Sequence, residues 1–256
     1  KVLVAGSMGP TSKSLSLSPD AGNPAYRSHS FDEMKDVFKK QAAALINGGA
    51  DLILIETCFD ALNTKAALAA IQELGEIPVM ISVSVGDRSG RTLTGQTIEA
   101  FYTSVSHYPI LSFGLNCSLG ASELMPLMED IGKWCSCAVS CYPNAGLPNE
   151  MGGYDQSPEE MADQLKVMAE KGLVNIVGGC CGTTPAHIKA IAEAVKGMKP
   201  RDFSGKRQHV LKISGLEAVT VDIKQSNFTN VGERTNVAGS RKFARLIAAG
   251  DYESAL

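Results

Sequence analysis

The sequence predicts an α/β fold in which a parallel sheet is covered by helices. Two observations over the first 196 residues lead to this prediction. Short runs that are almost continuously apolar recur along the chain, as expected of parallel strands buried on both faces. Amphipathic helical patterns separate these runs, and no block of consecutive strands interrupts the alternation. Strict strand–helix alternation requires crossover connections, which favour a parallel sheet.

Each expected strand is four or five residues long and is followed by a loop that contains Gly, Asn or acidic residues. The expected strands are residues 2–5, 52–55, 79–83, 111–115, 138–141 and 174–177.

The clearest helical pattern lies between Phe31 and Ile46, where apolar residues recur at helical spacing until Gly48 and Gly49 end it. The later patterns at 158–171 and 185–195 each begin with a Ser or Thr followed by proline, a typical N-cap and first helical residue. The remaining expected helices are residues 61–74, 97–107 and 122–133.

Two architectures fit six strand–helix units: an open doubly wound sheet and a (βα)8 TIM-type barrel. No G-x-G-x-x-G motif follows the first strand, which weakens the dinucleotide-binding form of the open sheet. A barrel requires eight units, so a barrel would be incomplete here, with two units expected before Lys1.

The pattern changes after residue 196. Residues 197–215 have no hydrophobic period and contain three Gly residues and one Pro, so they are expected to be an interdomain linker. We therefore divide the chain into domains at 1–196 and 216–256, with a helix expected at 241–249.

Composition excludes several classes of protein. The chain has 24 Lys and Arg against 27 Asp and Glu, which argues against a nucleic-acid-binding protein. No run of about 18 apolar residues is present, so no membrane span is expected. Seven cysteines without a secretory segment indicate a reducing compartment, and we expect a cytoplasmic protein.

Ligands in parallel α/β folds bind at the carboxyl ends of the strands, where Cys180 and Cys181 lie between glycines. Adjacent cysteines rarely form a disulfide with each other because its geometry is strained. Cys117, at another strand end, offers a third thiolate. Three thiolates on tetrahedral Zn²⁺ leave one position open, as in catalytic sites. The alternative, that these cysteines pack as small apolar residues, stays open.

The other cysteines are weaker candidates. Cys135, Cys137 and Cys141 alternate along one extended segment, so we expect them on one face, packed in the core. Cys58 lies at a strand end and is a weaker candidate for a ligand.

Glu56 and Asp60 follow the end of a strand, and His187 lies close in sequence to Cys181. Glu56 could bind a substrate ammonium group or act as a base, or it could be an ordinary loop acid. Asp60 is expected to cap a helix. His187 is expected to be a solvated residue in the first turn of a helix.

Three motifs resemble the homocysteine-binding module of cobalamin-dependent methionine synthases. These are Gly-Leu-Asn-Cys117, Pro-Asn-Ala-Gly-Leu-Pro148 and Val-Gly-Gly-Cys-Cys-Gly-Thr-Thr-Pro185. Residues 228–243 resemble the start of the same family's methyltetrahydrofolate-binding domain. The resemblance covers nearly the whole chain, and its second part separates this family from homocysteine methyltransferases that use betaine or methylmethionine.

The resemblance implies a (βα)8 barrel followed by the first unit of a second α/β barrel. It implies Zn²⁺ bound by Cys117, Cys180 and Cys181, with Glu56 on the amino group of homocysteine. Positions associated with the pterin match Gly239, Ser240 and Arg241.

The expected function is zinc-dependent activation of homocysteine for S-methylation to methionine. The methyl group would come from methyltetrahydrofolate through methylcobalamin, bound by another domain of the same polypeptide. The resemblance also places the first two barrel strands before Lys1, so a closed barrel is not expected from this chain alone.

Other functions remain compatible with the residues. One is a folate-independent homocysteine S-methyltransferase. Another is a cysteine-dependent α/β enzyme with Cys117 or Cys180 as nucleophile, which would need a base that no histidine is placed to supply. A third is a non-enzymatic zinc module, which would need a fourth protein ligand.

Overall fold

The computed structural model describes residues 2–203, 210–230, 232 and 236–255. The chain divides into two compact units. The first contains residues 1–207 and 212–220, and the second contains residues 208–211 and 221–256. Each unit is described by itself.

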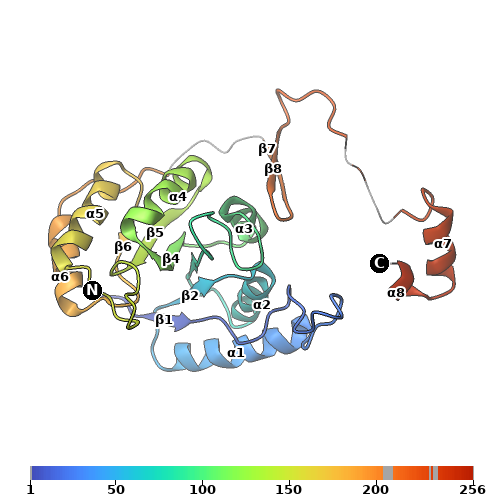
Figure 1. The fold of residues 1–256 in the computed structure, drawn as a ribbon, viewed down its shortest axis with the longest axis horizontal. Coiled ribbons are helices and arrows are strands. Elements are labelled where there is room, and N and C mark those ends of the chain that lie inside the picture. Colours follow the sequence, from blue (N-terminus) through green and yellow to red (C-terminus); the bar gives the residue numbers. More distant parts are fainter. Residues whose placement is uncertain (1, 204–209, 231, 233–235, 256) are drawn as a thin grey trace. The chain divides into compact units, whose positions relative to one another are not determined.

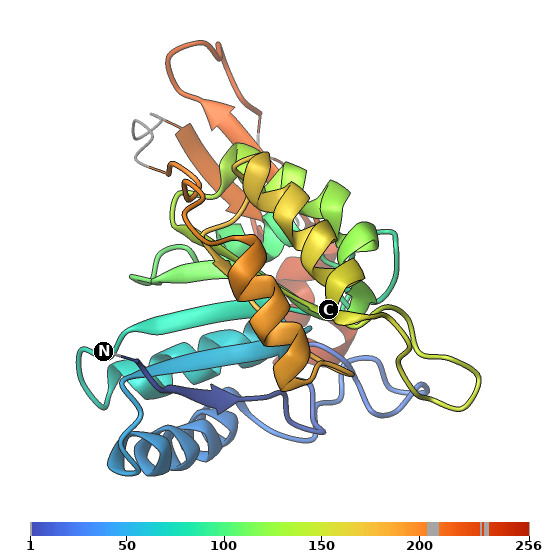
Figure 2. The ribbon, with the colours of Figure 1, turned by 90° about the vertical axis from the view of Figure 1, so that its left-hand side faces the viewer.

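The first unit contains a six-stranded parallel sheet whose strands follow one another in chain order (Figures 1 and 2). A doubly wound sheet would reverse its strand order at a switch point, so this alternative was wrong. The prediction of an α/β fold with an incomplete TIM-type barrel is confirmed. The strands are β1 (Ala5–Met8), β2 (Leu52–Cys58), β3 (Val79–Val83), β4 (Ser112–Gly120), β5 (Ala138–Asn144) and β6 (Ile176–Val177).

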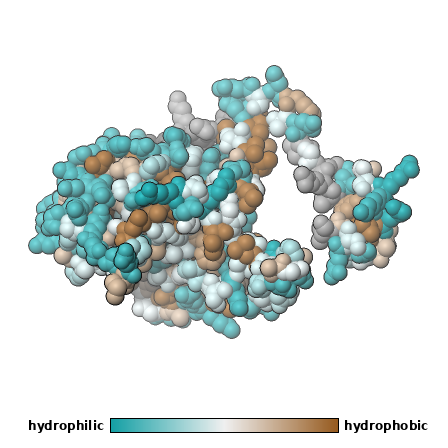
Figure 3. Space-filling model, viewed as in Figure 1, coloured by the Kyte–Doolittle hydropathy of each residue, from teal (hydrophilic) through white to brown (hydrophobic). Residues whose placement is uncertain are grey.

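Six helices alternate with these strands and lie outside the sheet (Figure 1). Figure 3 shows hydrophilic residues over the outer surface where α5 (Pro158–Glu170) and α6 (Pro185–Ala194) lie, as their amphipathic patterns predict. Capping boxes at Ser30, Ser157 and Thr184 begin three of the helices, and those at Ser157 and Thr184 confirm the expected start signals. The helices are α1 (Phe31–Asn47), α2 (Ala61–Gln72), α3 (Ile98–Val105), α4 (Ala121–Trp134), α5 (Pro158–Glu170) and α6 (Pro185–Ala194).

Strand boundaries differ from the expected ones because backbone pairing, rather than apolar character, sets them. Residues 2–4 are apolar but exposed, and β1 begins at Ala5, which pairs with Leu52. Both β4 and β5 continue beyond their apolar runs, and Asn116 pairs with Tyr142 in this extension. The extension carries polar and thiol side chains to the carboxyl end of the sheet.

The core lies between the sheet and the helices, and every residue of β3 is buried. Gly114 allows β4 and β5 to approach closely, because a Cβ atom there would lie 1.8 Å from the carbonyl oxygen of Ser140. Tyr102, Phe113 and Trp134 form an aromatic cluster near the amino ends of these strands, with the Tyr102 and Phe113 rings 4.9 Å apart and edge-on.

The segment expected as a linker contains regular structure. Strand β7 (Val210–Ser214) pairs with β8 (Ala218–Asp222), so the linker does not extend to residue 215, and residues 204–209 lie outside the described part. Val210 and Lys212, which alternate along β7, are half-buried. The turn belongs to the first unit, and the Leu216 carbonyl accepts a hydrogen bond of 3.0 Å from the Thr97 amide.

The second unit contains α7 (Arg241–Ala248) and α8 (Tyr252–Ala255), and α7 confirms the helix expected at 241–249. A second α/β barrel stays a prediction. In the described ranges, no helix is both long and apolar enough to span a membrane.

Candidate metal centre

Three cysteine thiols meet at the carboxyl end of the sheet. Cys117 lies in β4, and Cys180 and Cys181 follow β6, yet their sulfur atoms all lie within 4.8 Å of one another. The Cys117 and Cys181 sulfurs are 3.7 Å apart, and those of Cys180 and Cys181 are 4.0 Å apart. Within the described part of the chain, this is the one group of three or more His, Cys, Asp or Glu side chains whose ligand atoms lie close enough together to hold a metal ion.

A bulge in β4 presents Cys117 to this cluster. The pairing of β4 with β5 shifts register between Asn116 and Gly120, and Cys117 and Ser118 have positive φ angles of 63° and 60°. Left-handed backbone is unfavourable for residues other than glycine and is concentrated at functional sites. Ser118 is held there by a hydrogen bond of 2.6 Å between its hydroxyl and that of Ser84.

Backbone hydrogen bonds to the end of β5 fix the loop that carries Cys180 and Cys181. The Cys180 amide donates to the Pro143 carbonyl at 2.8 Å, and the Cys181 amide donates to the Asn144 side chain at 3.1 Å. Gly182 follows with φ of +79°, and a Cβ atom there would lie 2.4 Å from Tyr154. The glycine therefore permits the turn that places two adjacent thiols at one site.

Asn116 links the thiol cluster to the end of β2. This residue is 1% exposed, and its Nδ2 donates to Cys180 Sγ at 3.6 Å and to Thr57 Oγ1 at 2.9 Å. Its Oδ1 accepts from the Thr57 amide at 3.0 Å. Our sequence reasoning gave Asn116 no role, although it directly precedes Cys117 in one of the motifs that carry the resemblance.

Glu56 lies at the end of β2, directly before Thr57, and is partly exposed. Its Oε1 accepts a hydrogen bond from the Ser7 hydroxyl, which fixes the carboxylate beside β1. Burial raises the pKa of Tyr142 to about 12, and the charge of Glu56 contributes to this increase. Through Thr57 and Asn116, the structure joins Glu56 to the thiol cluster.

Burial and the neighbouring thiols oppose the ionisation of Cys180. Burial raises the pKa of Cys180 to about 12, and the charges of Cys117 and Cys181 add to this effect, while the hydrogen bond from Asn116 opposes it. A cation at the cluster would favour three thiolates, because it would compensate this repulsion.

The remaining cysteines lie away from the cluster. Cys58 and Cys141 are buried, and burial raises the pKa of each thiol to about 12. Cys135 ends α4 and Cys137 precedes β5, so the expected single face of a strand was wrong for this trio. The chain bends before the strand begins, and only Cys141 lies within β5.

His187 is not solvated, which corrects the sequence expectation. It is 6% exposed, with Nδ1 2.9 Å from the Thr184 hydroxyl and Nε2 2.9 Å from the Gln156 carbonyl. The ring therefore links the start of α6 to the segment that precedes α5. Asp60 is confirmed as the N-cap of α2, because it accepts hydrogen bonds from the amides of Leu62 and Asn63.

The residues expected to bind folate lie in the second unit. Ser240 caps α7 by accepting a hydrogen bond from the Phe243 amide, and Gly239 and Arg241 flank it. This capping does not depend on a ligand, so a pterin site there stays a prediction.

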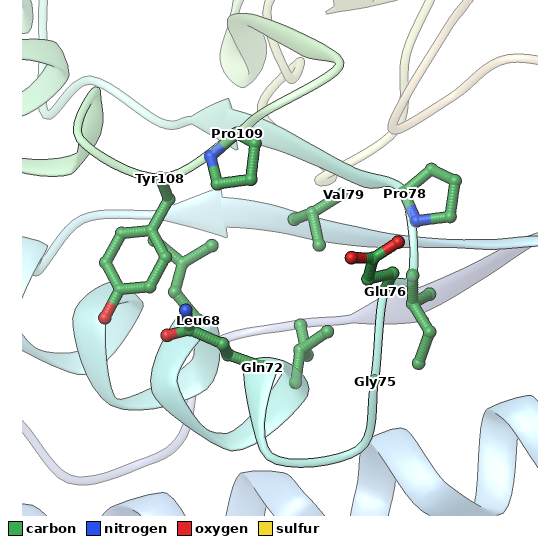
Figure 4. A pocket seen from close by; sticks show the side chains of 10 residues that line it. Leu68, Gln72, Gly75, Glu76, Pro78, Val79, Tyr108 and Pro109 are labelled. Carbon is green, nitrogen blue, oxygen red and sulfur yellow. The ribbon is translucent and has the colours of Figure 1, made fainter.

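A pocket of about 490 Å³ lies at the amino end of β3, away from the thiols (Figure 4). Leu68, Val79 and the ring of Tyr108 point into it in Figure 4, and Pro78 and Pro109 border it. Its lining contains no cysteine or histidine. Its chemistry is that of an apolar surface pocket rather than of a catalytic site.

Comparisons with known proteins agree with this fold. The model of the family described as homocysteine S-methyltransferase matches residues 1–195. The homocysteine methyltransferase MmuM from Escherichia coli, in its apo form, is similar to the chain with a TM-score of 0.57 and 23% identity. The match covers 75% of this chain and 63% of the other, so the chain spans less than two thirds of that relative's length.

The metallated form of the same protein matches with a TM-score of 0.54 and 22% identity. That match covers 66% of this chain and 53% of the other. At these identities the structural matches show the fold.

Proposed function

The chain belongs to the homocysteine S-methyltransferase family, and from this premise we propose that its first unit activates homocysteine for S-methylation. The observation that carries the proposal is the convergence of the Cys117, Cys180 and Cys181 sulfurs at the carboxyl end of a barrel-type sheet. The carboxyl ends of barrel strands are where active sites of this fold lie.

We assign these three thiols to a zinc ion, because their spacing suits one. A tetrahedral ion with Zn–S bonds of about 2.3 Å requires sulfurs about 3.8 Å apart. The two separations of 3.7 and 4.0 Å agree with this requirement. Three protein ligands leave a fourth position for the substrate sulfur. When bound, zinc supplies a positive charge that lowers the pKa of a thiol that is ordinarily near 8.5.

The protein side chains bind and orient the substrate. We assign Glu56 to the ammonium group of homocysteine, because its carboxylate is partly exposed near the cluster and fixed by Ser7. Asn116 holds Cys180 through its amide and thereby fixes the direction of one ligand. The two groups act on opposite ends of the amino acid, so their roles are separable.

We further propose that the methyl group derives from methyltetrahydrofolate through methylcobalamin, as in cobalamin-dependent methionine synthases. Residues 228–243 support this, because they resemble the start of that family's folate domain and lie in the second unit. Gly239, Ser240 and Arg241 would then contact the pterin, and a cobalamin-binding domain would be the partner. We place the protein in the cytoplasm, where its thiols would stay reduced.

A folate-independent homocysteine S-methyltransferase is the second candidate, favoured by the similarity to MmuM. A nucleophilic cysteine mechanism is less well supported. Among the described residues, His187 is the histidine nearest in sequence to Cys181. Both its nitrogens are already hydrogen-bonded, one to Thr184 at the start of α6 and the other to the Gln156 carbonyl before α5.

The test combines metal analysis with donor specificity. The full-length protein should contain one zinc per chain and should methylate homocysteine with methyltetrahydrofolate only when cobalamin is present. Activity with a methylated sulfonium or betaine donor in the absence of folate and cobalamin would favour the second candidate. Absence of zinc together with undiminished activity would contradict the metal assignment.

A further inference from the structure

A second pair of thiols lies at the opposite end of the strands from the metal centre. Cys135, at the end of α4, and Cys137, before β5, have sulfur atoms 3.6 Å apart. Cys135 is 4% exposed, whereas Cys137 is partly exposed. Neither residue takes part in the function proposed above.

A buried cation contacts the backbone of this pair. Arg201 is 8% exposed, and its guanidinium donates to the carbonyls of Gly132, Cys135 and Cys137 at 3.2, 2.6 and 3.1 Å. Within the described part of the chain, these hydrogen bonds all go to neutral carbonyl oxygens. The positive charge of Arg201 therefore remains available to stabilise a thiolate beside it.

The two thiols have different acidities. A hydrogen bond from Cys137 lowers the pKa of Cys135 to about 7, and the charge of Arg201 contributes to this decrease. The pKa of Cys137 is raised, first of all by its hydrogen bond with Cys135. One thiolate beside one thiol is the arrangement found in reactive cysteine pairs.

We propose that Cys135 and Cys137 form a redox-modification site, at which a hydroperoxide converts the two thiols to a disulfide and a cellular dithiol restores them. The geometry supports this proposal, since the two sulfur atoms are already in contact and a single residue, Ser136, separates the two cysteines in the sequence.

The reaction balances with hydrogen peroxide as oxidant. The Cys135 thiolate attacks one peroxide oxygen, the O–O bond breaks, and the products are a sulfenic acid and hydroxide, which takes up a proton to give water. The Cys137 sulfur then attacks Cys135 Sγ, the S–O bond breaks, and a second water leaves with the Cys137 proton. Two thiols lose two electrons, and one peroxide is reduced to two water molecules.

Disulfide formation would also disturb the contact with Arg201. An S–S bond of about 2.05 Å requires the sulfurs to approach by about 1.5 Å from their present separation. The carbonyls of both cysteines are acceptors for Arg201, so this movement changes the geometry of its hydrogen bonds. The segment around Arg201 follows α6 in the chain. We therefore expect oxidation to weaken the contacts that hold this segment against the pair.

Peptide mapping of the metal-loaded, full-length protein tests the chemistry. Trypsin cleavage after Lys133 and Lys166 places both thiols in the peptide 134–166, whereas Cys117 and Cys180 fall in the peptides 92–133 and 172–189. After mild treatment with hydrogen peroxide and alkylation of free thiols, peptide 134–166 should lose two alkylation sites and regain them after reduction with a dithiol.

Variants separate this pair from Cys141, which lies in the same peptide. Cys135→Ser and Cys137→Ser should each abolish disulfide formation within peptide 134–166, whereas Cys141→Ala should leave it unchanged. A Cys135–Cys137 disulfide that fails to form in the wild type, or a disulfide that requires Cys141, would overturn the proposal.

Limited trypsin digestion under native conditions tests the link to Arg201. Cleavage after Arg201 should be several-fold faster in the oxidised wild type than in the reduced wild type, and peroxide should not change it in Cys135→Ser. Equal rates in the oxidised and reduced wild type would show that the disulfide leaves the Arg201 contact intact and would refute that part of the proposal.

Discussion

Asn116 directly precedes Cys117 in β4, and its side chain joins the ends of two strands to the loop that follows a third. It donates to Thr57 at the end of β2 and to Cys180 after β6, and it accepts from the Thr57 amide. Thr57 has a positive φ angle of 57°, so this contact also holds a strained residue beside Glu56. The amide therefore positions a thiol and the neighbouring carboxylate together.

Replacing Asn116 tests its role as a positioning residue. Asn116→Asp keeps an acceptor for the Thr57 amide but loses the N–H donor to Cys180 and adds a charge near the thiols. We expect zinc affinity to fall about 10–100-fold, as for other partners of metal ligands. Competition with a chelator measures this affinity, and unchanged affinity in a folded Asn116→Asp protein would refute the role.

The two cysteine trios should differ in their effect on metal content. Replacing Cys117, Cys180 or Cys181 with Ser should abolish tight zinc binding, because each supplies one of three converging sulfurs. Replacing Cys135, Cys137 or Cys141 with Ser should leave zinc content near one per chain. Elemental analysis of the full-length variants provides the measurement, and the reverse pattern would contradict the assignment.

Homocysteine binding to the metal-loaded protein should release close to one proton near pH 7. The thiol of free homocysteine is mostly protonated at this pH, whereas a sulfur bound to zinc is a thiolate, so its proton must be released on binding. Calorimetry in buffers of different ionisation enthalpy measures the proton. After removal of the metal, the release should disappear. Its persistence in the metal-free protein would argue against activation of the thiol by zinc.

Glu56→Ala provides a matched control for this measurement. The variant should weaken homocysteine binding by about 1.5–3 kcal/mol, the usual contribution of a charged hydrogen bond. It should leave zinc content and the released proton nearly unchanged, because we assign Glu56 to the amino group.

At the scale of elements, helices α1 and α2 are joined by an ion-pair network. Glu73, the C-cap of α2, accepts from Lys35 and Lys39 of α1, each at 2.8 Å. Hydrogen bonds from these lysines lower the pKa of Glu73 to about 2 from its usual value of 4.5. All three side chains are partly exposed, so salt should weaken the network.

The lowered pKa predicts how this network depends on pH. A carboxyl whose pKa is lower in the folded state stabilises the fold above its unfolded pKa, and this stabilisation is lost as pH falls from about 4.5 towards 2. Glu73→Gln should be less stable than wild type at pH 7, with a difference that shrinks over this range. Denaturant unfolding at several pH values provides the measurement, and a difference independent of pH would refute the network.

At the scale of the molecule, the six-stranded sheet has two open edges. β1 and β6 are its end strands, and within the described ranges each pairs on one side only. β6 contains two residues, and the apolar residues Val2, Leu3 and Val4 before β1 are exposed. Open parallel edges expose unpaired backbone groups and favour association.

We therefore expect residues 1–256, expressed alone, to be unstable and to lack homocysteine binding. Thermal denaturation followed by circular dichroism, together with calorimetry, would measure both properties. A cooperative transition accompanied by homocysteine binding would show that six strand–helix units suffice.

The sequence alone determined the element order, because apolar runs and capping residues are local signals. All six strands and their helices were predicted, with errors mainly at the ends, as at β1 and in the segment that contains β7. The choice of the two glycine-flanked cysteines and Cys117 as a group also came from sequence, since all three follow or end parallel strands.

Local patterns left a doubly wound sheet and a barrel-type sheet open, and the barrel was expected from the family resemblance alone. The tertiary structure decided between them, because strand order depends on pairing between distant segments. The roles of Asn116 and His187 were likewise hidden, since their partners Thr57 and Gln156 lie 59 and 31 residues away. The contact between Arg201 and the Cys135–Cys137 pair spans more than 60 residues. Local patterns determine which residues form an element, but long-range packing determines which side chains meet.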